Sequence, residues 1–396
     1  MKPTRRTSKQ KSNTDTQLLQ KLAMNLDKSA SIVEDHWWQK KLFALVDGML
    51  LAGQENELTN ALDTLAEADS RAQAALADSL EGAAETIEFE INGQSYVSLL
   101  IAAPIMAWSR YAVPSSSLSN EVLTPLKTQF AAHFLANDVQ LTLADFLFSP
   151  DQLPRSFCDT RELLNALTES AKAGKPHNVD ASTMPETNRF LADIRYLVGC
   201  VIAPKGNPIF RWQEPDGDRL TALTQWQQQG LVNLSDVMSG CAVEGLMANA
   251  YHAACRDADR AIRPYSLTAS VLLLHALLNL EPAQLQATVC PCFDKELVEY
   301  RVGFGPIGSL NIFHGMAWPA LDEADGFGNG DVQAEMEAAI EATIRKTGIT
   351  DIEFLTQQFP MEFCEDCGAP FYPNREGELV HIEMPEPEQH SSLTLH

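Results

Sequence analysis

Apolar residues recur at helical spacing through the first part of the chain. Three stripes with intervals of mostly three to five residues predict three helices: Val33, Trp37, Leu42, Leu45 and Leu50; Leu58, Leu62 and Leu65; and Ala72, Leu76 and Leu80. The pattern therefore predicts a helical segment over residues 16–85. Residues 1–15 before it are basic and polar and show no apolar periodicity, which predicts a disordered arm.

The pattern changes to that of strands after residue 85. Ile87, Phe89 and Ile91 alternate with polar residues, and Asn92-Gly93 is the sequence of a type I′ hairpin turn. The elements expected after this turn are a strand over the apolar run 96–103, a helix with the stripe Val122, Leu126, Phe130 and Phe134, and a strand over 139–148 that ends at Pro150. Together they predict a strand–strand–helix–strand lobe.

Part of this pattern recurs at a constant offset of 210 residues. The matched features are a glycine, a strand-end tryptophan, a helical stripe and a terminating proline: Gly93 and Gly303, Trp108 and Trp318, Val122–Phe134 and Val332–Ile344, and Pro150 and Pro360. One offset that joins four features predicts an internal duplication. Pro208-Ile209 with Trp212 repeats Pro104-Ile105 with Trp108 and suggests a partial third copy.

These patterns predict the class α+β, with a helical N-terminal segment and duplicated, in part triplicated, lobes built on mostly antiparallel sheets. In the middle lobe one helix is expected from Asn249 and another from Pro264, since proline fits the first turn of a helix. The expected organisation is a disordered arm (1–15), a helical segment (16–85), lobe 1 (86–150), a helical and loop linker (151–190), a middle lobe (191–293), lobe 2 with a knuckle-like hairpin (294–383) and an acidic tail (384–396).

Composition and charge narrow the class of protein. The 396 residues include 29 Lys and Arg against 53 Asp and Glu, a formal net charge of −24. Nucleic-acid binding is therefore not expected outside the basic arm, because phosphates must be neutralised by Lys and Arg. No apolar run reaches the roughly 20 residues of a membrane-spanning helix, and no signal-peptide core follows the basic start. Eight cysteines in such a chain indicate reduced thiols or metal ligands, and we expect a cytoplasmic protein without membrane contact.

The sharpest motif is Cys364-Glu365-Asp366-Cys367-Gly368, which has the pattern of a zinc knuckle. One knuckle supplies two thiolates, so a tetrahedral structural zinc needs further ligands, and these would be either Cys290 and Cys292 or His381. The alternatives are a knuckle that has lost its metal and persists as a turn, and a redox dithiol. Glu365 and Asp366 disfavour the dithiol because acidic neighbours raise thiol pKa values.

Arginines gather in the segment Tyr251–Tyr265. Arg256, Arg260 and Arg263 lie on one side of a predicted helix, where they could hold an anionic ligand with His252 and Tyr265 as neighbours. The alternative is a surface helix with Arg256–Asp259, Asp257–Arg260 and Asp259–Arg263 ion pairs. His314, after an apolar strand, is a further candidate for the same ligand.

Recognisable catalytic motifs are absent from the sequence. Gly303–Gly308 has the spacing Gly-x-Gly-x-x-Gly, but Pro306 lies inside it and no helix follows, so we reject a phosphate loop. The chain lacks a Gly-x-Ser-x-Gly elbow, a Walker lysine and His-Glu-x-x-His.

Four stretches together resemble an uncharacterised bacterial family, domain of unknown function 2863: Glu34–Trp38, Ala102–Tyr111, Ala254–Tyr265 and Phe363–Pro370. The family pattern has Pro-Asp where this chain has Ala248-Asn249. The resemblance covers most of the chain and implies a cytosolic bacterial protein, without implying an activity.

The motifs and the charge support two alternative functions, and the basic residues 1–15 support a third. The first is a non-enzymatic cytosolic scaffold that acts through protein partners and carries a structural zinc. The second is an enzyme or small-molecule sensor that binds an anionic ligand between the lobes at the arginines. RNA binding through residues 1–15 is the third. The sequence sets neither the ligand nor the oligomeric state.

Overall fold

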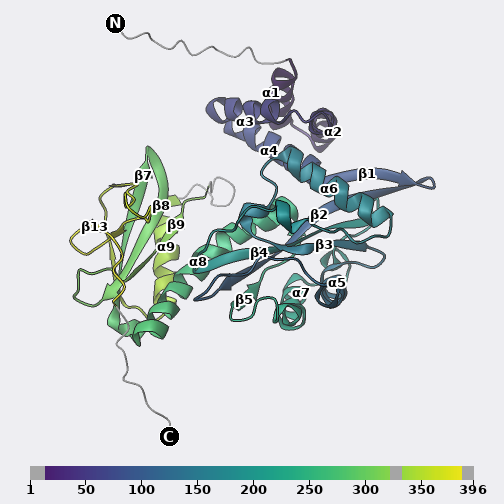
Figure 1. The fold of residues 1–396 in the computed structure, drawn as a ribbon. Coiled ribbons are helices and arrows are strands. Elements are labelled where there is room, and N and C mark those ends of the chain that lie inside the picture. Colours follow the sequence, from purple (N-terminus) through teal and green to yellow (C-terminus); the bar gives the residue numbers. More distant parts are fainter. Residues whose placement is uncertain (1–13, 322–331, 386–396) are drawn as a thin grey trace.

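The computed structural model describes residues 14–321 and 332–385, so most of the predicted basic arm and acidic tail lies outside the described residues. The helical segment is confirmed (Figure 1), and its helices are α1 (Thr14–Asp27), α2 (Ile32–Leu51), α3 (Glu55–Ala68) and α4 (Ser70–Glu85). They enclose a core of their own that includes Leu19, Leu42, Leu58 and Leu76. Val33 and Trp37, two residues of the predicted stripe, are instead exposed on α2.

The first sheet has the strand order β1-β2-β4-β3, and β5 and β6 pair with β2 beyond this path. Its strands are β1 (Thr86–Ile91), β2 (Gln94–Trp108), β3 (Gln140–Phe148), β4 (Ala192–Pro204), β5 (Ala242–Gly245) and β6 (Asn249–Ala250). Asn92 and Gly93 both have positive φ and join β1 to β2, as a type I′ turn requires.

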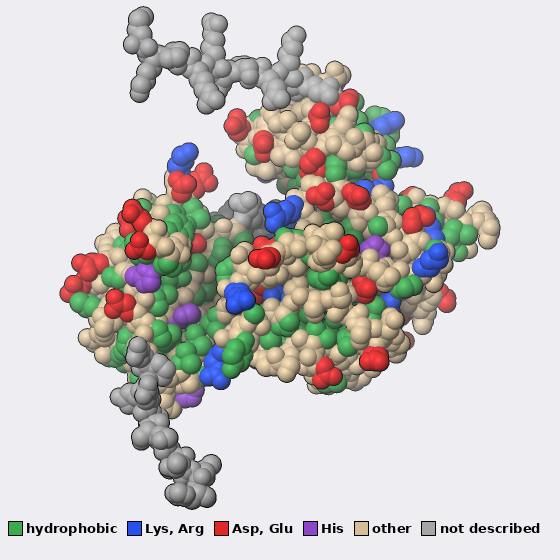
Figure 2. Space-filling model, viewed as in Figure 1, with side chains coloured by type: hydrophobic (Ala, Val, Ile, Leu, Met, Phe, Trp, Pro, Cys, Tyr) green, Lys and Arg blue, Asp and Glu red, His purple; other side chains and the backbone are tan. Residues whose placement is uncertain are grey.

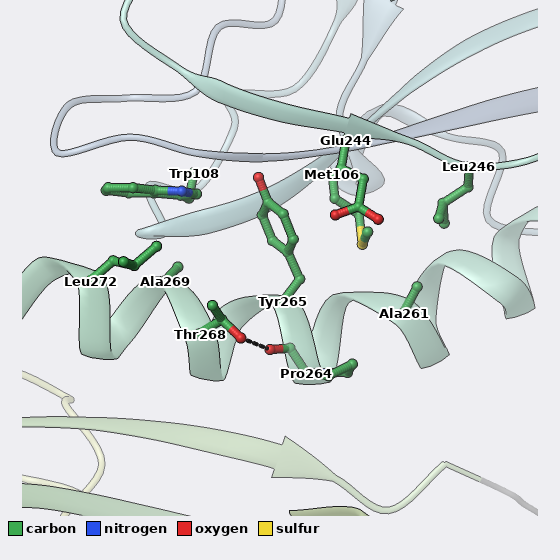
Figure 3. A pocket seen from close by; sticks show the side chains of 10 residues that line it. All are labelled: Met106, Trp108, Glu244, Leu246, Ala261, Pro264, Tyr265, Thr268, Ala269 and Leu272. Carbon is green, nitrogen blue, oxygen red and sulfur yellow. Dashed lines mark hydrogen bonds between the residues drawn. The ribbon is translucent and has the colours of Figure 1, made fainter. Parts of the chain in front are cut away.

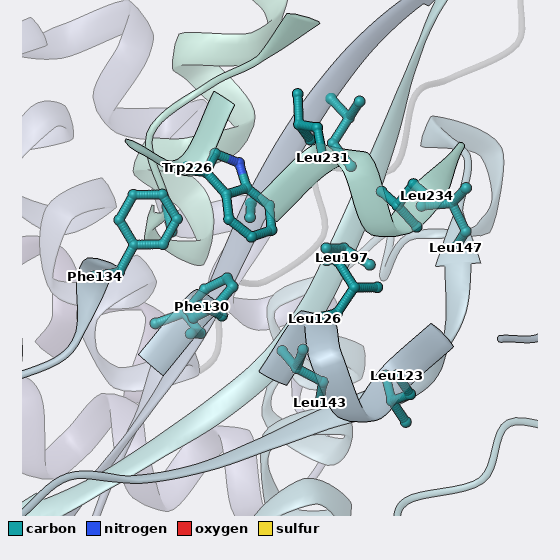
Figure 4. Close-up of a cluster of buried hydrophobic side chains, with 14 of the residues drawn as sticks. Leu123, Leu126, Phe130, Phe134, Leu143, Leu147, Leu197, Trp226, Leu231 and Leu234 are labelled. Atoms are coloured by element: carbon teal, nitrogen blue, oxygen red, sulfur yellow. The ribbon is translucent and has the colours of Figure 1, made fainter. Parts of the chain in front are cut away.

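Helices cover both faces of this sheet because β2 is apolar on both sides. Ile101, Ala103 and Ile105 face a core with α5 (Asn120–Phe134) and the segment around Trp226, which follows α7 (Arg219–Gln225) (Figure 4). Alternate residues such as Leu100 and Ala102 face α6 (Phe157–Lys172) and the start of α8 (Tyr251–Leu278). A strand covered on both faces reads as a continuous apolar run, which is the pattern of residues 96–103.

Helix α8 connects the two sheets (Figure 1). Its first half, with Tyr251 and Ala258, belongs to the core of the first sheet, and its second half, with Leu267 and Leu274, belongs to the core of the second. The expectation of separate helices from Asn249 and Pro264 is wrong, since one helix runs through Pro264. A proline costs a helix one backbone hydrogen bond, and the packing of both halves compensates for that loss here.

The second sheet has the strand order β10-β7-β8-β9, with β11 paired to β7 and a small β12–β13 hairpin beside it. The elements are β7 (Leu285–Asp294), β8 (Glu296–Pro306), β9 (His314–Pro319), α9 (Val332–Lys346), β10 (Asp351–Phe354), β11 (Phe359–Pro360), β12 (Tyr372–Pro373) and β13 (Leu379–Val380). The long strands β7, β8 and β9 pair antiparallel, and the short strands β10 and β11 run parallel to β7. The class α+β is confirmed.

The strands divide the chain differently from the predicted lobes. Strand β4, assigned to the middle lobe, pairs along its length with β2 of lobe 1, and β7 belongs to the second sheet. The sheet to which a strand belongs is decided by long-range pairing, because a central strand needs a neighbouring strand on each side. The equivalence of Gly93 and Gly303 is also wrong, since Gly303 lies inside β8 and not in a turn. The duplication itself stays a prediction.

Candidate metal centre

The C-terminal segment packs against the second sheet and carries the knuckle. Strand β12 lies so close to the second sheet that two sheet positions have room only for glycine. A Cβ on Gly315 would lie 2.4 Å from the Tyr372 ring, and a Cβ on Gly303 would lie 2.7 Å from the Pro373 carbonyl oxygen. The sheet therefore fixes the position of β12, and β12 with β13 forms the hairpin that leads to His381.

The knuckle is a closed turn. The Gly368 N–H donates to the Cys364 carbonyl at 2.8 Å, and the Cys364 N–H donates to the Ala369 carbonyl at 2.8 Å. Gly368 has φ +71°, a conformation that glycine adopts without strain. The two bonds close the turn, and the positive φ that this geometry requires falls on a glycine.

Three possible metal ligands converge there. The ligand atoms of Cys364, Cys367 and His381 lie within 4.8 Å of one another, and Cys367 Sγ is 3.2 Å from His381 Nε2. A tetrahedral zinc with Zn–S of about 2.3 Å and Zn–N of about 2.0 Å needs ligand atoms roughly 3.5 to 4 Å apart. The Sγ–Nε2 separation is a few tenths of an ångström shorter than this, so small side-chain adjustments would bring the group to the geometry of the ion. Of the two ligand sets expected from the sequence, the structure thus brings together the one in which His381 joins Cys364 and Cys367.

The imidazole of His381 is oriented for such a role. Its Nδ1 lies 2.8 Å from the Ile382 carbonyl oxygen. Because a carbonyl only accepts, Nδ1 carries the proton and the lone pair of Nε2 points toward the sulfur. A backbone carbonyl on the second ring nitrogen is a common way to orient a metal-binding histidine.

A buried arginine that the sequence analysis missed holds the knuckle in place. The Nη1 atom of Arg301 donates to the Glu362 carbonyl at 2.6 Å and to the Phe371 carbonyl at 2.8 Å, and these two residues lie on either side of the turn. Its Nε atom donates to Glu299 at 2.8 Å, and its side chain is fully buried. A charge between the apolar neighbours Tyr300 and Val302 was the signal that could have found it.

Cys290 and Cys292 do not join this group. Both are fully buried on β7 beside Phe359, with their sulfurs 3.8 Å apart. Their mutual contact and burial raise the pKa of the Cys290 thiol above its usual range, which disfavours the thiolate that a metal needs. They occupy the core and not the exposed knuckle.

The three arginines of α8 contact different neighbours. Arg256 pairs with Glu81 of α4, and Arg260 lies 3.9 Å from Asp257, which is one of the predicted pairs. Arg263 is buried, donates to the Pro319 carbonyl at 3.1 Å and lies over the Trp318 ring. The side chains of Arg256 and Arg263 thus fasten α8 to α4 and to β9.

The remaining predicted residues are also engaged in packing. The His252 N–H donates to Glu85 at 3.0 Å, and burial together with the charge of Arg256 lowers the pKa of its ring to about 4. His314 Nε2 lies 3.1 Å from the Ser270 hydroxyl, and burial lowers its pKa to about 4. The Tyr265 hydroxyl donates to the Ala242 carbonyl at 2.9 Å.

Comparison with protein families finds a match over nearly the whole chain. The model of a family described as "Protein of unknown function (DUF2863)" matches residues 4–395. Neither a curated protein nor a solved structure matches the chain.

Length and composition alone would allow one described helix, α8, to cross a membrane. Helices in the cores of soluble proteins pass the same test, and α8 packs against both sheets.

Proposed function

Because the chain belongs to the DUF2863 family, whose description gives no activity, we propose its function from its own site: a zinc-binding scaffold that acts in the cytoplasm through protein partners. The observation that carries the proposal is the convergence of Cys364, Cys367 and His381 within 4.8 Å. Two thiolates and an imidazole are ligands that zinc favours.

The metal would have a structural role. When bound, zinc would link the knuckle to His381, which directly follows β13, and so fix a segment with few backbone pairs of its own. The three described ligands leave one tetrahedral position for water or for a donor from a partner. Cys367 and His381 are exposed, and Phe363 beside the knuckle is 49% exposed, so this end of the molecule is accessible to a protein.

The acidic surface favours protein partners over nucleic acid. Red acidic side chains outnumber blue basic ones on the face shown in Figure 2, over the helical part and over both sheets. An arm of basic residues at the N-terminus is the one feature that favours RNA, and removal of residues 1–15 tests it directly.

Metal analysis of the full chain tests the proposal. We expect about one zinc per chain for the wild type and for the control Cys241→Ser. Cys241 is a partly exposed cysteine that does not belong to the Cys364–Cys367–His381 group. Cys367→Ser and His381→Ala should each lose most of the metal. Less than about half an equivalent in the wild type after zinc supplementation would refute the proposal.

A ligand screen separates the scaffold from the anion-binding alternative. Thermal unfolding with nucleotides and phosphorylated metabolites should show no stabilisation, because Arg256 and Arg263 already contact Glu81 and the Pro319 carbonyl. Stabilisation by one such anion that disappears in Arg260→Ala would favour the alternative.

A further inference from the structure

A cavity of about 410 Å³ lies where α8 leaves the first sheet for the second (Figure 3). This volume is within the range of small-molecule sites, roughly 300 to 1,000 Å³. Its wall comes from the ends of β2 and β5 and from one side of the helix, with the residues Met106, Trp108, Glu244, Leu246, Ala261, Pro264, Tyr265, Thr268, Ala269 and Leu272.

Strand register places the sheet side of the cavity. Met106 and Trp108 are two residues apart on β2, so their side chains leave the same face. Met106 pairs directly with Glu244 on β5, and paired residues of neighbouring strands also share a face. Figure 3 shows the Glu244 carboxylate pointing toward α8 and the Trp108 ring lying along the helix above Leu272 and Ala269.

Helical spacing places the opposite side. Ala261, Tyr265, Thr268 and Leu272 follow one another at intervals of three and four residues, which puts them on one stripe of α8. The helix packs on the core of the first sheet as far as Ile262 and enters the second core from Leu267 onward, so the cavity opens where the helix diverges from the first sheet.

The chemistry of the lining is apolar and aromatic with a negative charge. Among the described residues that line the cavity, Glu244 is the one with a charge, its side chain is exposed, and no ion pair in the described ranges 14–321 and 332–385 uses it. The Tyr265 hydroxyl is bonded to Ala242, which leaves the ring free to face a ligand. Burial and the charge of Glu244 raise the pKa of this phenol, in agreement with a negative field in the cavity.

We propose that this cavity binds an organic cation, an alkylated ammonium group on a small apolar body, between the Glu244 carboxylate and the rings of Trp108 and Tyr265. Aromatic faces attract cations through the ring quadrupole, and a carboxylate adds a full opposite charge. An anion would meet repulsion from Glu244. The site thus selects a charge opposite to that expected from the arginines of the same helix.

The proposal is independent of zinc, since the lining shares no residue with the metal centre. Choline and benzyltrimethylammonium are suitable probes because both carry a quaternary ammonium group. The neutral control is 3,3-dimethylbutan-1-ol, in which carbon replaces the nitrogen of choline. Titration calorimetry on the full chain at low salt should show binding of at least one cation and about tenfold weaker binding of the neutral alcohol.

Variants locate the site. Glu244→Gln should weaken cation binding about tenfold, and Trp108→Leu should do the same with the charge retained. Glu90→Gln is the matched control, because Glu90 is also an exposed strand glutamate but lies on β1 away from the cavity lining. Thermal unfolding of each variant shows that it is folded. Absence of binding by both cations at about 10 mM, equal binding of the neutral alcohol, or unchanged affinity in Glu244→Gln would each overturn the proposal.

Discussion

Glu85 gives the sharpest test of the electrostatics that join the helical segment to α8. It is the last residue of α4, and its Oε2 atom accepts the His252 N–H at 3.0 Å. Ala250, the residue before α8, offers no side-chain cap, so the carboxylate of Glu85 takes that role for the first turn. Burial raises its pKa from 4.5 to about 7; Glu81 also raises it, while the His252 bond and the charge of Arg256 lower it.

The raised pKa sets the sign of the pH dependence. The folded chain keeps the Glu85 proton at pH values where the unfolded chain has lost it. Its contribution to stability is therefore fully present below pH 4.5 and is lost as the pH rises to about 7. One pKa unit corresponds to about 1.4 kcal/mol, so the loss amounts to at most about 3 kcal/mol. Glu85→Gln removes the titration and keeps an oxygen that can accept the His252 N–H.

The assay is urea unfolding of wild type and Glu85→Gln at intervals from pH 4.5 to 8. Histidines that titrate with the opposite sign, His252 among them, affect both proteins, so the difference between the two curves is the informative quantity. We expect Glu85→Gln to gain up to about 3 kcal/mol on the wild type across this range. A flat difference, or one of the opposite sign, would refute the reasoning.

Three further predictions concern buried groups. Arg301→Met leaves the Glu362 and Phe371 carbonyls without their donor, and we expect zinc affinity, measured by chelator competition, to fall about tenfold or more; unchanged affinity would contradict the role of Arg301. Arg161→Met leaves Asp47 and the Ala83 carbonyl unpaired and should lower the free energy of unfolding in urea by about 3 to 5 kcal/mol, against less than 1 if the contact is incidental. Because the pKa of His314 is lowered from 6.5 to about 4, the wild type should lose up to about 3 kcal/mol as the pH falls between these values; His314→Gln should flatten that part of the curve, and an equally steep variant would exclude this source.

Local patterns were sufficient for what depends on neighbours in the chain. The stripes with Leu58 and Leu76, the Asn92-Gly93 turn and the closed knuckle around Gly368 all follow from spacing and backbone preference. Local patterns could not decide between His381 and the pair Cys290 and Cys292 as further metal ligands. That choice depends on how the β12–β13 hairpin packs on the second sheet.

Contacts between distant segments could not be read from periodicity. Spacing on one helix suggested Arg256 with Asp259, whereas the partner of Arg256 is Glu81 from another helix. The cavity has the same origin, since Trp108 and Glu244 come together only when β5 pairs with β2. Strand pairing of this kind has no local signal in a single sequence.

The continuity of α8 has a consequence for how the molecule comes apart. Its 28 residues extend about 40 Å and contribute side chains to the cores of both sheets. Loss of either sheet removes the packing from half of this helix, and an isolated half of about 14 residues is marginal in water. We therefore expect the two sheets to melt as one cooperative unit, and a proteolytic cut within residues 251–278 to leave neither product with a complete core.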